Sequence, residues 1–156
     1  MDGTEIYFLR KGKGRYFVVD ILSREKRSWN MSRITSKDTK PEVLVRSYLF
    51  QHGFRFRKND KRLPGTPDIV LLKYHVVIFV NGCFWHHHRD CHLAYVPKTR
   101  TDFWLKKFRS NEVNDKLHRD ALERMGWKVI IIWECELKEH FEMVMQRIVA
   151  ILKEGS

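Results

Sequence analysis

Apolar side chains repeat at helical spacing in the first well-patterned stretch of the chain. The repeat runs through Leu44, Val45, Tyr48 and Leu49. Thr39, followed three residues later by Glu42, is a capping-box pattern, and Pro41 between them suits the first turn of a helix. Gly53 is a typical helix stop. The pattern therefore predicts a helix that begins after Thr39 and ends at Gly53.

Short apolar or alternating segments predict four strands. They cover residues 54–57, 68–72, 75–80 and 128–133. Segment 75–80 is apolar enough to be buried on both faces of a sheet, and segment 128–133 is expected to be central. Because only two residues separate segments 68–72 and 75–80, these two strands are expected to pair as a hairpin.

Two longer helical patterns complete the domain. Residues 101–125 are helical in pattern, with a break expected near Ser110 and Asn111, and an amphipathic pattern from Leu137 to Leu152 predicts a closing helix. The order is helix, three strands, helix, strand, helix. It predicts an α/β sandwich in which a mixed sheet is flanked by helices on both faces.

The N-terminal part of the chain has a different pattern. Residues 1–22 contain two short apolar runs around a Lys-Gly-Lys-Gly-Arg stretch, which favours a hairpin or an extension of unknown role. Residues 23–40 are polar and basic, with Trp29, Met31 and Ile34 as isolated apolar positions. These fit either a short helix docked on the domain or an arm lying on nucleic acid, with Met31 or Ile34 as apolar wedges.

The charge balance indicates a polyanionic partner. The 156 residues include 30 Lys and Arg against 19 Asp and Glu, for a net charge of +11. Nucleic acid is the default partner for such an excess, and an anionic membrane surface is the alternative. No apolar run approaches the roughly 20 residues of a membrane helix, and no signal peptide is recognisable. A soluble, cytoplasmic protein is therefore expected.

The densest chemistry lies in the stretch Gly82–Cys91, which holds two cysteines, three consecutive histidines and the pair Phe84–Trp85. An odd total of three cysteines favours a metal site in a reducing compartment over disulfides. Candidate zinc ligands are His88, Cys91 and Cys135, with Asp90 and Asp115 available as a fourth. The alternatives are a solvated loop and a buried Cys135 that acts as a small hydrophobic residue.

Asp68 follows Pro67 at the mouth of the strand next to this loop. A carboxylate there can hold a divalent cation, because Mg²⁺ prefers hard oxygen ligands. Glu42 at the helix start could reach the same site, although the capping box alone explains it. Phosphodiester hydrolysis needs charge neutralisation and an activated water, which a metal on Asp68 and a neutral histidine would supply.

Five segments of the chain together resemble the very-short-patch repair (Vsr) mismatch endonucleases. They are residues 30–42, 63–68, 77–86, 97–104 and 133–135. The strings Gly82–His86 and Arg100–Trp104 are the most specific. The resemblance covers residues 23–152 in order. It implies a single endonuclease domain over residues 23–156, with residues 23–38 as a DNA-contacting arm and residues 1–22 as an extension.

This resemblance implies a restriction-endonuclease-like fold of the PD-(D/E)xK type, a three-layer sandwich with a structural zinc. It implies a monomeric enzyme that nicks one DNA strand 5′ of the T in a T·G mismatch, where 5-methylcytosine has deaminated. The partner is double-stranded DNA in the bacterial nucleoid, with functional links to a DNA cytosine methyltransferase and to mismatch repair proteins.

The family's site residues carry over by position. Asp68 is the ligand of catalytic Mg²⁺, Val80 offers its backbone oxygen to the same ion, His86 is the general base and Glu42 supports the site. The structural Zn²⁺ falls on His88, Cys91, Asp115 and Cys135. Phe84, Trp85 and Trp104 match aromatics that wedge into the duplex, and Met31 and Ile34 match the minor-groove arm. A T·G wobble pair is easier to unstack than a matched pair, so such wedges favour the mismatch.

Three departures from the family pattern bear on these assignments. Val80 and Asn81 stand where the best-known member has threonine and histidine, which leaves a backbone ligand but removes a second histidine. The His-to-Cys spacing is one residue longer, so His87 and His88 compete for zinc. The PD-(D/E)xK lysine is absent. A zinc-stabilised mismatch-binding module with weakened catalysis and a restriction-type nuclease acting on matched DNA are the alternatives.

Overall fold

The computed structural model describes residues 9–12, 15–18, 23–32 and 37–155, and it divides into two units, residues 1–36 and 37–156. In the first unit, β1 (Leu9–Gly12) pairs antiparallel with β2 (Arg15–Val18), as the hairpin alternative predicted. Helix α1 (Arg24–Ser32) follows, and the Ser23 hydroxyl accepts the backbone N–H of Lys26 at 3.2 Å, as an N-cap does. Met31 is described only by its backbone in α1, and Ile34 lies outside the described residues.

The second unit is an α/β sandwich around a mixed sheet of four strands. The strand order is β3 (Arg57–Lys58), β4 (Ile69–Leu71), β5 (Val76–Asn81) and β6 (Lys128–Trp133). The first two pairs are antiparallel and β5–β6 is parallel. The predicted hairpin of β4 and β5 is confirmed, and its connection is the 3-10 turn η1 (Leu72–Tyr74).

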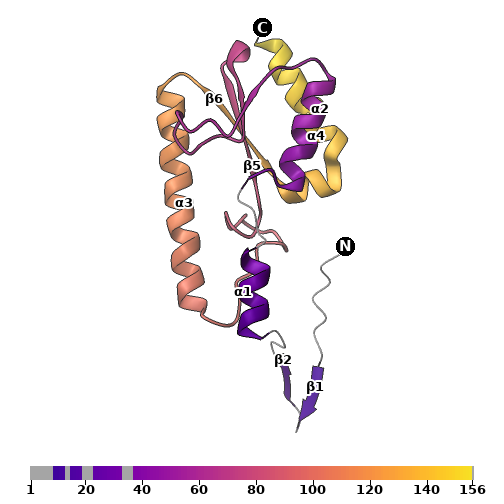
Figure 1. The fold of residues 1–156 in the computed structure, drawn as a ribbon, viewed down its shortest axis with the longest axis vertical. Helices are drawn as coiled ribbons and strands as arrows, with labels where there is room; N and C mark the ends of the chain where they lie inside the picture. The colour runs from indigo at the N-terminus through magenta and orange to yellow at the C-terminus, as the bar shows by residue number, and fades with distance from the viewer. Residues whose placement is uncertain (1–8, 13–14, 19–22, 33–36, 156) are drawn as a thin grey trace. The chain divides into compact units, whose positions relative to one another are not determined.

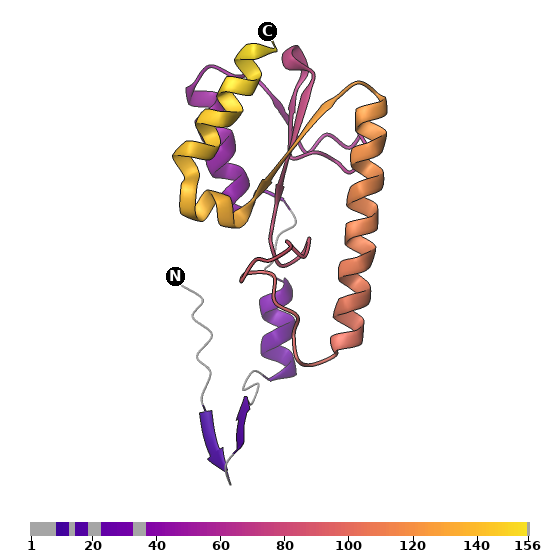
Figure 2. The ribbon, with the colours of Figure 1, turned by 180° about the vertical axis from the view of Figure 1, so that it is seen from behind.

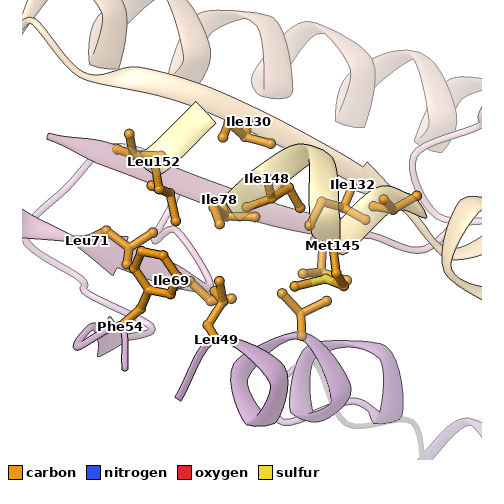
Figure 3. Packing of buried hydrophobic residues seen from close by; sticks show 14 of the residues in the cluster. Leu49, Phe54, Ile69, Leu71, Ile78, Ile130, Ile132, Met145, Ile148 and Leu152 are labelled. Carbon is orange, nitrogen blue, oxygen red and sulfur yellow. The ribbon is translucent and has the colours of Figure 1, made fainter. Parts of the chain in front are cut away.

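Helices cover both faces of this sheet. Figures 1 and 2 show α2 (Lys40–Gln51) and α4 (Glu134–Glu154) on one face and α3 (Thr101–Arg124) on the other. The larger core, between the sheet and the α2–α4 layer, includes Leu49, Ile69, Ile78 and Met145, which have no exposed surface (Figure 3). A smaller core under α3 contains Val70, Val77, Leu122 and Trp127. Neighbouring residues of one strand thus enter opposite cores, which is why segments 69–71 and 76–80 are apolar throughout.

Three predictions differ from the structure. Strand β6, expected to be central, lies at the edge of the four-stranded sheet and pairs with β5. The expected break near Ser110 and Asn111 is wrong, because α3 is continuous over 24 residues. The Asn111 side chain donates to the Trp85 carbonyl at 2.8 Å and so does not compete for the backbone of its own helix. The strand expected over residues 54–57 is reduced to Arg57–Lys58. Phe54 is instead buried in the core, with its ring against that of Tyr74 at the end of η1.

Two glycines with positive φ determine the loops on either side of β3, Gly53 at the end of α2 and Gly65 where the chain packs on α3. Gly53 has φ +84° and ends α2 as predicted, with its N–H on Phe50 O and the N–H of Phe54 on Leu49 O. Gly65 has φ +73°, and a Cβ there would stand 2.9 Å from the Cβ of His118 on α3. The turn before Asp68 therefore packs directly on α3, which requires glycine. None of the described helices is long and apolar enough to span a bilayer.

Candidate active site and metal centre

Asp68 stands at the end of the sheet where β5 and β6 terminate. Its Oδ2 accepts the backbone N–H of Val80 at 2.7 Å, so one carboxylate oxygen is used and Oδ1 remains for another partner. In an extended strand, the N–H and the C=O of one residue point to the same side, so the Val80 carbonyl faces the side on which Asp68 lies. The structure thus brings Asp68 and Val80, both predicted at one site, into contact.

The electrostatic environment of Asp68 opposes its negative charge. Burial raises the pKa of the Asp68 carboxyl from its ordinary 3.8 to about 6. The Val80 N–H lowers the pKa, the Glu42 carboxylate raises it again, and the charges of Arg46 and His86 lower it. A bound cation would stabilise the ionised form of this buried carboxyl and so lower its raised pKa.

Glu42 is buried at the N-terminus of α2 and is fully engaged there. Its Oε2 accepts the Asp38 N–H at 2.9 Å and a guanidinium N–H of Arg46 at 2.8 Å, and its Oε1 accepts the Thr39 hydroxyl at 2.9 Å. The predicted helix start is confirmed, but Glu42 reaches the N–H of Asp38 in place of that of Thr39. Glu42 therefore lies beside the Asp68 site as a charged, immobilised neighbour.

Arg46 is a residue of this site that the sequence reasoning missed. Its side chain is buried, with one guanidinium nitrogen on Glu42 and another 2.5 Å from Asp38 Oδ1. Its Nε has no hydrogen-bond partner among the described residues. The available signal was the four-residue spacing from Glu42, which places opposite charges on one helix face.

His86 is held by a carboxylate from α3. Its Nδ1 lies 2.5 Å from Asp115 Oδ2. An ionised carboxylate only accepts hydrogen bonds, so Nδ1 carries the proton and donates it. In the neutral imidazole, Nε2 then has the free lone pair. Asp115, predicted as a zinc ligand, lies here against His86 and outside the metal-ligating group described next.

Four side chains gather in a group suited to a metal ion: Cys83, His88, Cys91 and Cys135. One ligand atom from each lies within 4.8 Å of the others. His88 Nδ1 is 3.4 Å from Cys135 Sγ and 3.7 Å from Cys83 Sγ. Cys83 takes the fourth position that the sequence reasoning gave to Asp115. Cys83 is fully buried in the loop that follows β5, whereas the Asp115 carboxylate contacts His86.

The histidine run is divided among three environments. His86 meets Asp115, while the exposed His87 stacks on Phe108 with ring centroids 4.9 Å apart. His88 stacks on Trp133 at 4.0 Å, and this fixes its ring among the thiols. Of the two histidines that compete for zinc, His88 is therefore the one placed with the cysteines.

The residues fit both implied metals. Three thiols and one imidazole are a zinc donor set, and burial raises the pKa of the Cys83 thiol to about 12, a penalty that a bound Zn²⁺ reverses by stabilising thiolate. The free oxygen of Asp68 and the Val80 carbonyl are hard ligands of the kind Mg²⁺ takes, with water completing its shell.

The predicted wedge aromatics lie together beside His86. Phe84 is half-buried, with its ring 5.1 to 5.4 Å from the rings of Trp85, Tyr95, Trp104 and Phe108. Trp85 and Trp104 are half-buried, 6.0 Å apart, and the Trp85 carbonyl is held by Asn111. Phe84 is thus the centre of the aromatic cluster, and Trp85 and Trp104 pack around it.

A carboxylate at the end of a mixed sheet, next to a carboxylate-oriented histidine on a strongly cationic chain, is typical of metal-dependent nucleases. Comparisons with known proteins agree. A family model described as DNA mismatch endonuclease Vsr matches residues 19–93. A protein named type II nicking enzyme V.NmeAIP, from Neisseria meningitidis, is 54% identical over 121 residues, which cover 78% of this chain and 86% of that protein.

Two further relatives carry similar names. Type II nicking enzyme V.XorIIP from Xanthomonas oryzae is 45% identical over 122 residues, 78% of this chain and 89% of the relative. DNA mismatch endonuclease Vsr from Escherichia coli is 41% identical over 137 residues, 88% of this chain and 87% of the relative. The chain belongs to the DNA mismatch endonuclease Vsr family, a family of hydrolytic DNA endonucleases. The predicted resemblance and the predicted enzyme class are confirmed.

Proposed function

We propose that this protein nicks one strand of double-stranded DNA 5′ of the T in a T·G mismatch left by deamination of 5-methylcytosine. The hydrogen bond between His86 and Asp115 carries the proposal. Family membership supports the endonuclease activity, and the names of the relatives support single-strand cleavage. The fold in this proposal is the restriction-endonuclease-like variant of the α/β sandwich.

His86 is the general base in this proposal. Asp115 fixes the tautomer with the proton on Nδ1, so Nε2 can accept a proton from the water that attacks the phosphorus. The bond from phosphorus to the leaving sugar oxygen breaks, and that oxygen takes up a proton from solvent. The same Asp115 carboxylate stabilises the imidazolium cation that forms when Nε2 of His86 takes up the proton. Trp133, with its ring 6.5 Å from that of His86, closes one side of the histidine.

Asp68 and the Val80 carbonyl would hold Mg²⁺. When bound, the ion would neutralise charge on the scissile phosphate. The Asp68 carboxylate is oriented by its bond to the Val80 N–H, and its other oxygen would be the one that binds the metal. Glu42, compensated by Arg46, acts behind Asp68 as a positioning residue.

Zn²⁺ on Cys83, His88, Cys91 and Cys135 is structural in this proposal. The group joins the loop after β5 to the start of α4, because Cys135 belongs to α4. His86 lies between Cys83 and His88 in sequence, so a bound metal would limit the movement of this histidine.

Mismatch preference comes from Phe84, Trp85, Trp104, Met31 and Ile34 in this proposal. Trp85 and Trp104 present aromatic rings that can stack on bases where unstacking is easiest, at the wobble pair. The protein acts as a monomer on DNA of the bacterial nucleoid in the cytoplasm, where a cytosine methyltransferase creates the sites that deaminate.

A strand-specific nicking assay tests the proposal. Duplexes that differ only in one base pair, T·G or a matched pair, are labelled on either strand and incubated with Mg²⁺. The expected product is one nick 5′ of the mispaired T, abolished in Asp68→Ala and His86→Ala. Binding of the mismatch without nicking would support the catalytically weakened module, and equal double-strand cleavage of matched DNA would support the restriction-type nuclease.

A further inference from the structure

The edge strand β3 and the loop after it form a concentrated cationic surface beside the candidate site. Five cations lie between residues 55 and 62, all of them exposed: Arg55, Arg57, Lys58, Lys61 and Arg62. Asp60 is the one acidic residue in this segment, and Arg62 neutralises it with contacts of 2.6 and 2.8 Å. Residues 55–62 therefore carry a local charge of +4, a large share of the net +11 of the chain.

Three of these cations are available to an external anion. Among the described residues, Arg57 and Lys61 have no carboxylate within ion-pair distance. Lys58 Nζ lies 3.5 Å from Asp38 Oδ1, an oxygen that the buried Arg46 already holds at the shorter distance of 2.5 Å. By contrast, Arg55 lies over the Phe50 ring at 4.6 Å, and Arg62 is held by Asp60.

Backbone pairing fixes the position of this surface relative to the site. Lys58 pairs with Ile69 and Arg57 with Val70 in the β3–β4 ladder. One residue further on, the Asn59 N–H donates to the backbone carbonyl of Asp68 at 3.3 Å. The cations thus begin one residue from Asp68 on the neighbouring strand, about 5 Å across the ladder.

A groove continues from Lys58 along α2. It has a volume of about 450 Å³ and is lined on one side by Arg46 and Phe50 of α2 and on the other by Phe56 and Lys58. Its charged lining consists of two cations, Arg46 and Lys58, and a single carboxylate, Asp38. Because Glu42 and Asp38 hold Arg46, the charges around the groove nearly balance, and the positive surface is confined to residues 55–62.

We propose that the surface formed by Arg57, Lys58 and Lys61 binds the phosphate backbone of the DNA duplex on which the site acts. A duplex seated at Asp68 extends well beyond one phosphate, and each neighbouring phosphate needs a cation within reach. Exposed Lys and Arg side chains on an edge strand suit contacts that carry no sequence information. The proposal rests on the proposed function for the identity of the anion, which is DNA.

Equilibrium binding at several KCl concentrations tests this surface. The zinc-loaded full-length protein is titrated, without Mg²⁺, into a labelled T·G duplex and into its matched counterpart. The variant is Arg57→Gln with Lys58→Gln and Lys61→Gln. The slope of log affinity against log salt is expected to fall by about one for each removed phosphate contact, equally for both duplexes.

Two matched variants make the result specific. Lys73→Gln with Lys128→Gln removes exposed charges at the opposite end of the sheet, where η1 and the start of β6 lie, and should leave the slope unchanged. Arg57→Lys with Lys58→Arg and Lys61→Arg keeps every charge and should bind like wild type, which would show that charge rather than side-chain identity determines the slope. A triple-Gln variant that melts normally and keeps the wild-type slope would overturn the proposal.

The two proposals can fail separately. Wild-type protein that nicks the T·G duplex while the triple-Gln variant keeps its salt slope would refute the surface alone. Loss of slope in the triple-Gln variant, with no nicking of any mismatch by wild type, would refute the proposed function and leave the surface in place.

Discussion

Asp115 on α3 lies 2.5 Å from the Nδ1 of His86 in the loop after β5, across 29 residues of sequence. The contact assigns the imidazole tautomer and directs Nε2 away from the helix. It also separates the carboxylate from the cysteine group that it was expected to join. The proposed catalytic base and the proposed zinc site therefore share one loop but have different partners.

Asp115→Asn is expected to reduce the nicking rate by about 10²–10⁴-fold, because the amide no longer fixes the Nδ1–H tautomer or stabilises the protonated histidine. Zinc content should stay at the wild-type level. Single-turnover rates measure the first quantity and metal analysis of the purified protein the second. Loss of zinc in this variant would return Asp115 to the metal site.

Cys83→Ser is expected to lower the zinc content and the melting temperature together, because a structural zinc site loses a thiolate ligand. His87→Ala is the matched control, since the exposed His87 stacks on Phe108 outside the cysteine group. It should keep its zinc. A Cys83→Ser protein with full zinc occupancy and wild-type stability would contradict the assignment.

The carboxyl of Asp68 should make stability depend on pH in the absence of Mg²⁺. Its pKa is about 6 in the folded protein, above the ordinary 3.8, so its contribution favours the folded state at low pH and is lost as the pH rises through about 6. Asp68→Asn is expected to raise the free energy of unfolding at pH 8 by about 1–3 kcal/mol. The advantage should shrink by about 1 kcal/mol at pH 5.

Asp60→Asn is the control of opposite sign. Hydrogen bonds from Arg62 lower the pKa of Asp60 to about 2, so its contribution to stability is present above the ordinary 3.8 and is lost as the pH falls through about 2. Asp60→Asn should therefore destabilise the protein at pH 8. Denaturant unfolding of both variants at pH 8 and pH 5 makes the comparison. A loss of stability at pH 8 in Asp68→Asn would contradict the account of Asp68.

Arg46→Met is expected to lower the free energy of unfolding by about 3–5 kcal/mol, because it leaves the buried Glu42 carboxylate without its cation. Adding Glu42→Gln in the same chain should recover most of that loss, since the uncompensated charge is then removed. The exposed Arg57→Met should have little effect, because among the described residues Arg57 has no carboxylate within ion-pair distance. Chemical denaturation of wild type, Arg46→Met, Glu42→Gln and the double variant gives the coupling between Arg46 and Glu42, and simple additivity would refute it.

Local pattern was enough to predict much of the fold. The spacing of Leu44, Val45, Tyr48 and Leu49 and the apolar run 76–80 are imposed by burial against the sheet and the helices, and both elements form where expected. The prediction of a strand over residues 54–57 was wrong because Phe54 packs into the core at the end of α2. The alternation of apolar and polar residues does not reveal this tertiary contact.

The partners of individual side chains were harder to predict. Asn111 and Asp115 were read as a helix break and a metal ligand, yet they stand one turn apart on α3 and hold Trp85 and His86. Their spacing from the apolar positions Phe108 and Leu122 places them on the inner face, a signal that the sequence did contain. Which residue of the loop each one would meet depends on how the loop folds back, and no short-range pattern specifies that.

Strand-specific cleavage of a T·G duplex with Mg²⁺ tests the central claim most directly. Wild-type protein should give a single nick 5′ of the mispaired T, while His86→Ala gives none and Asp115→Asn gives the same nick at a strongly reduced rate. Nicking by His86→Ala at the wild-type rate, or equal cleavage of both strands of a matched duplex, would contradict the account.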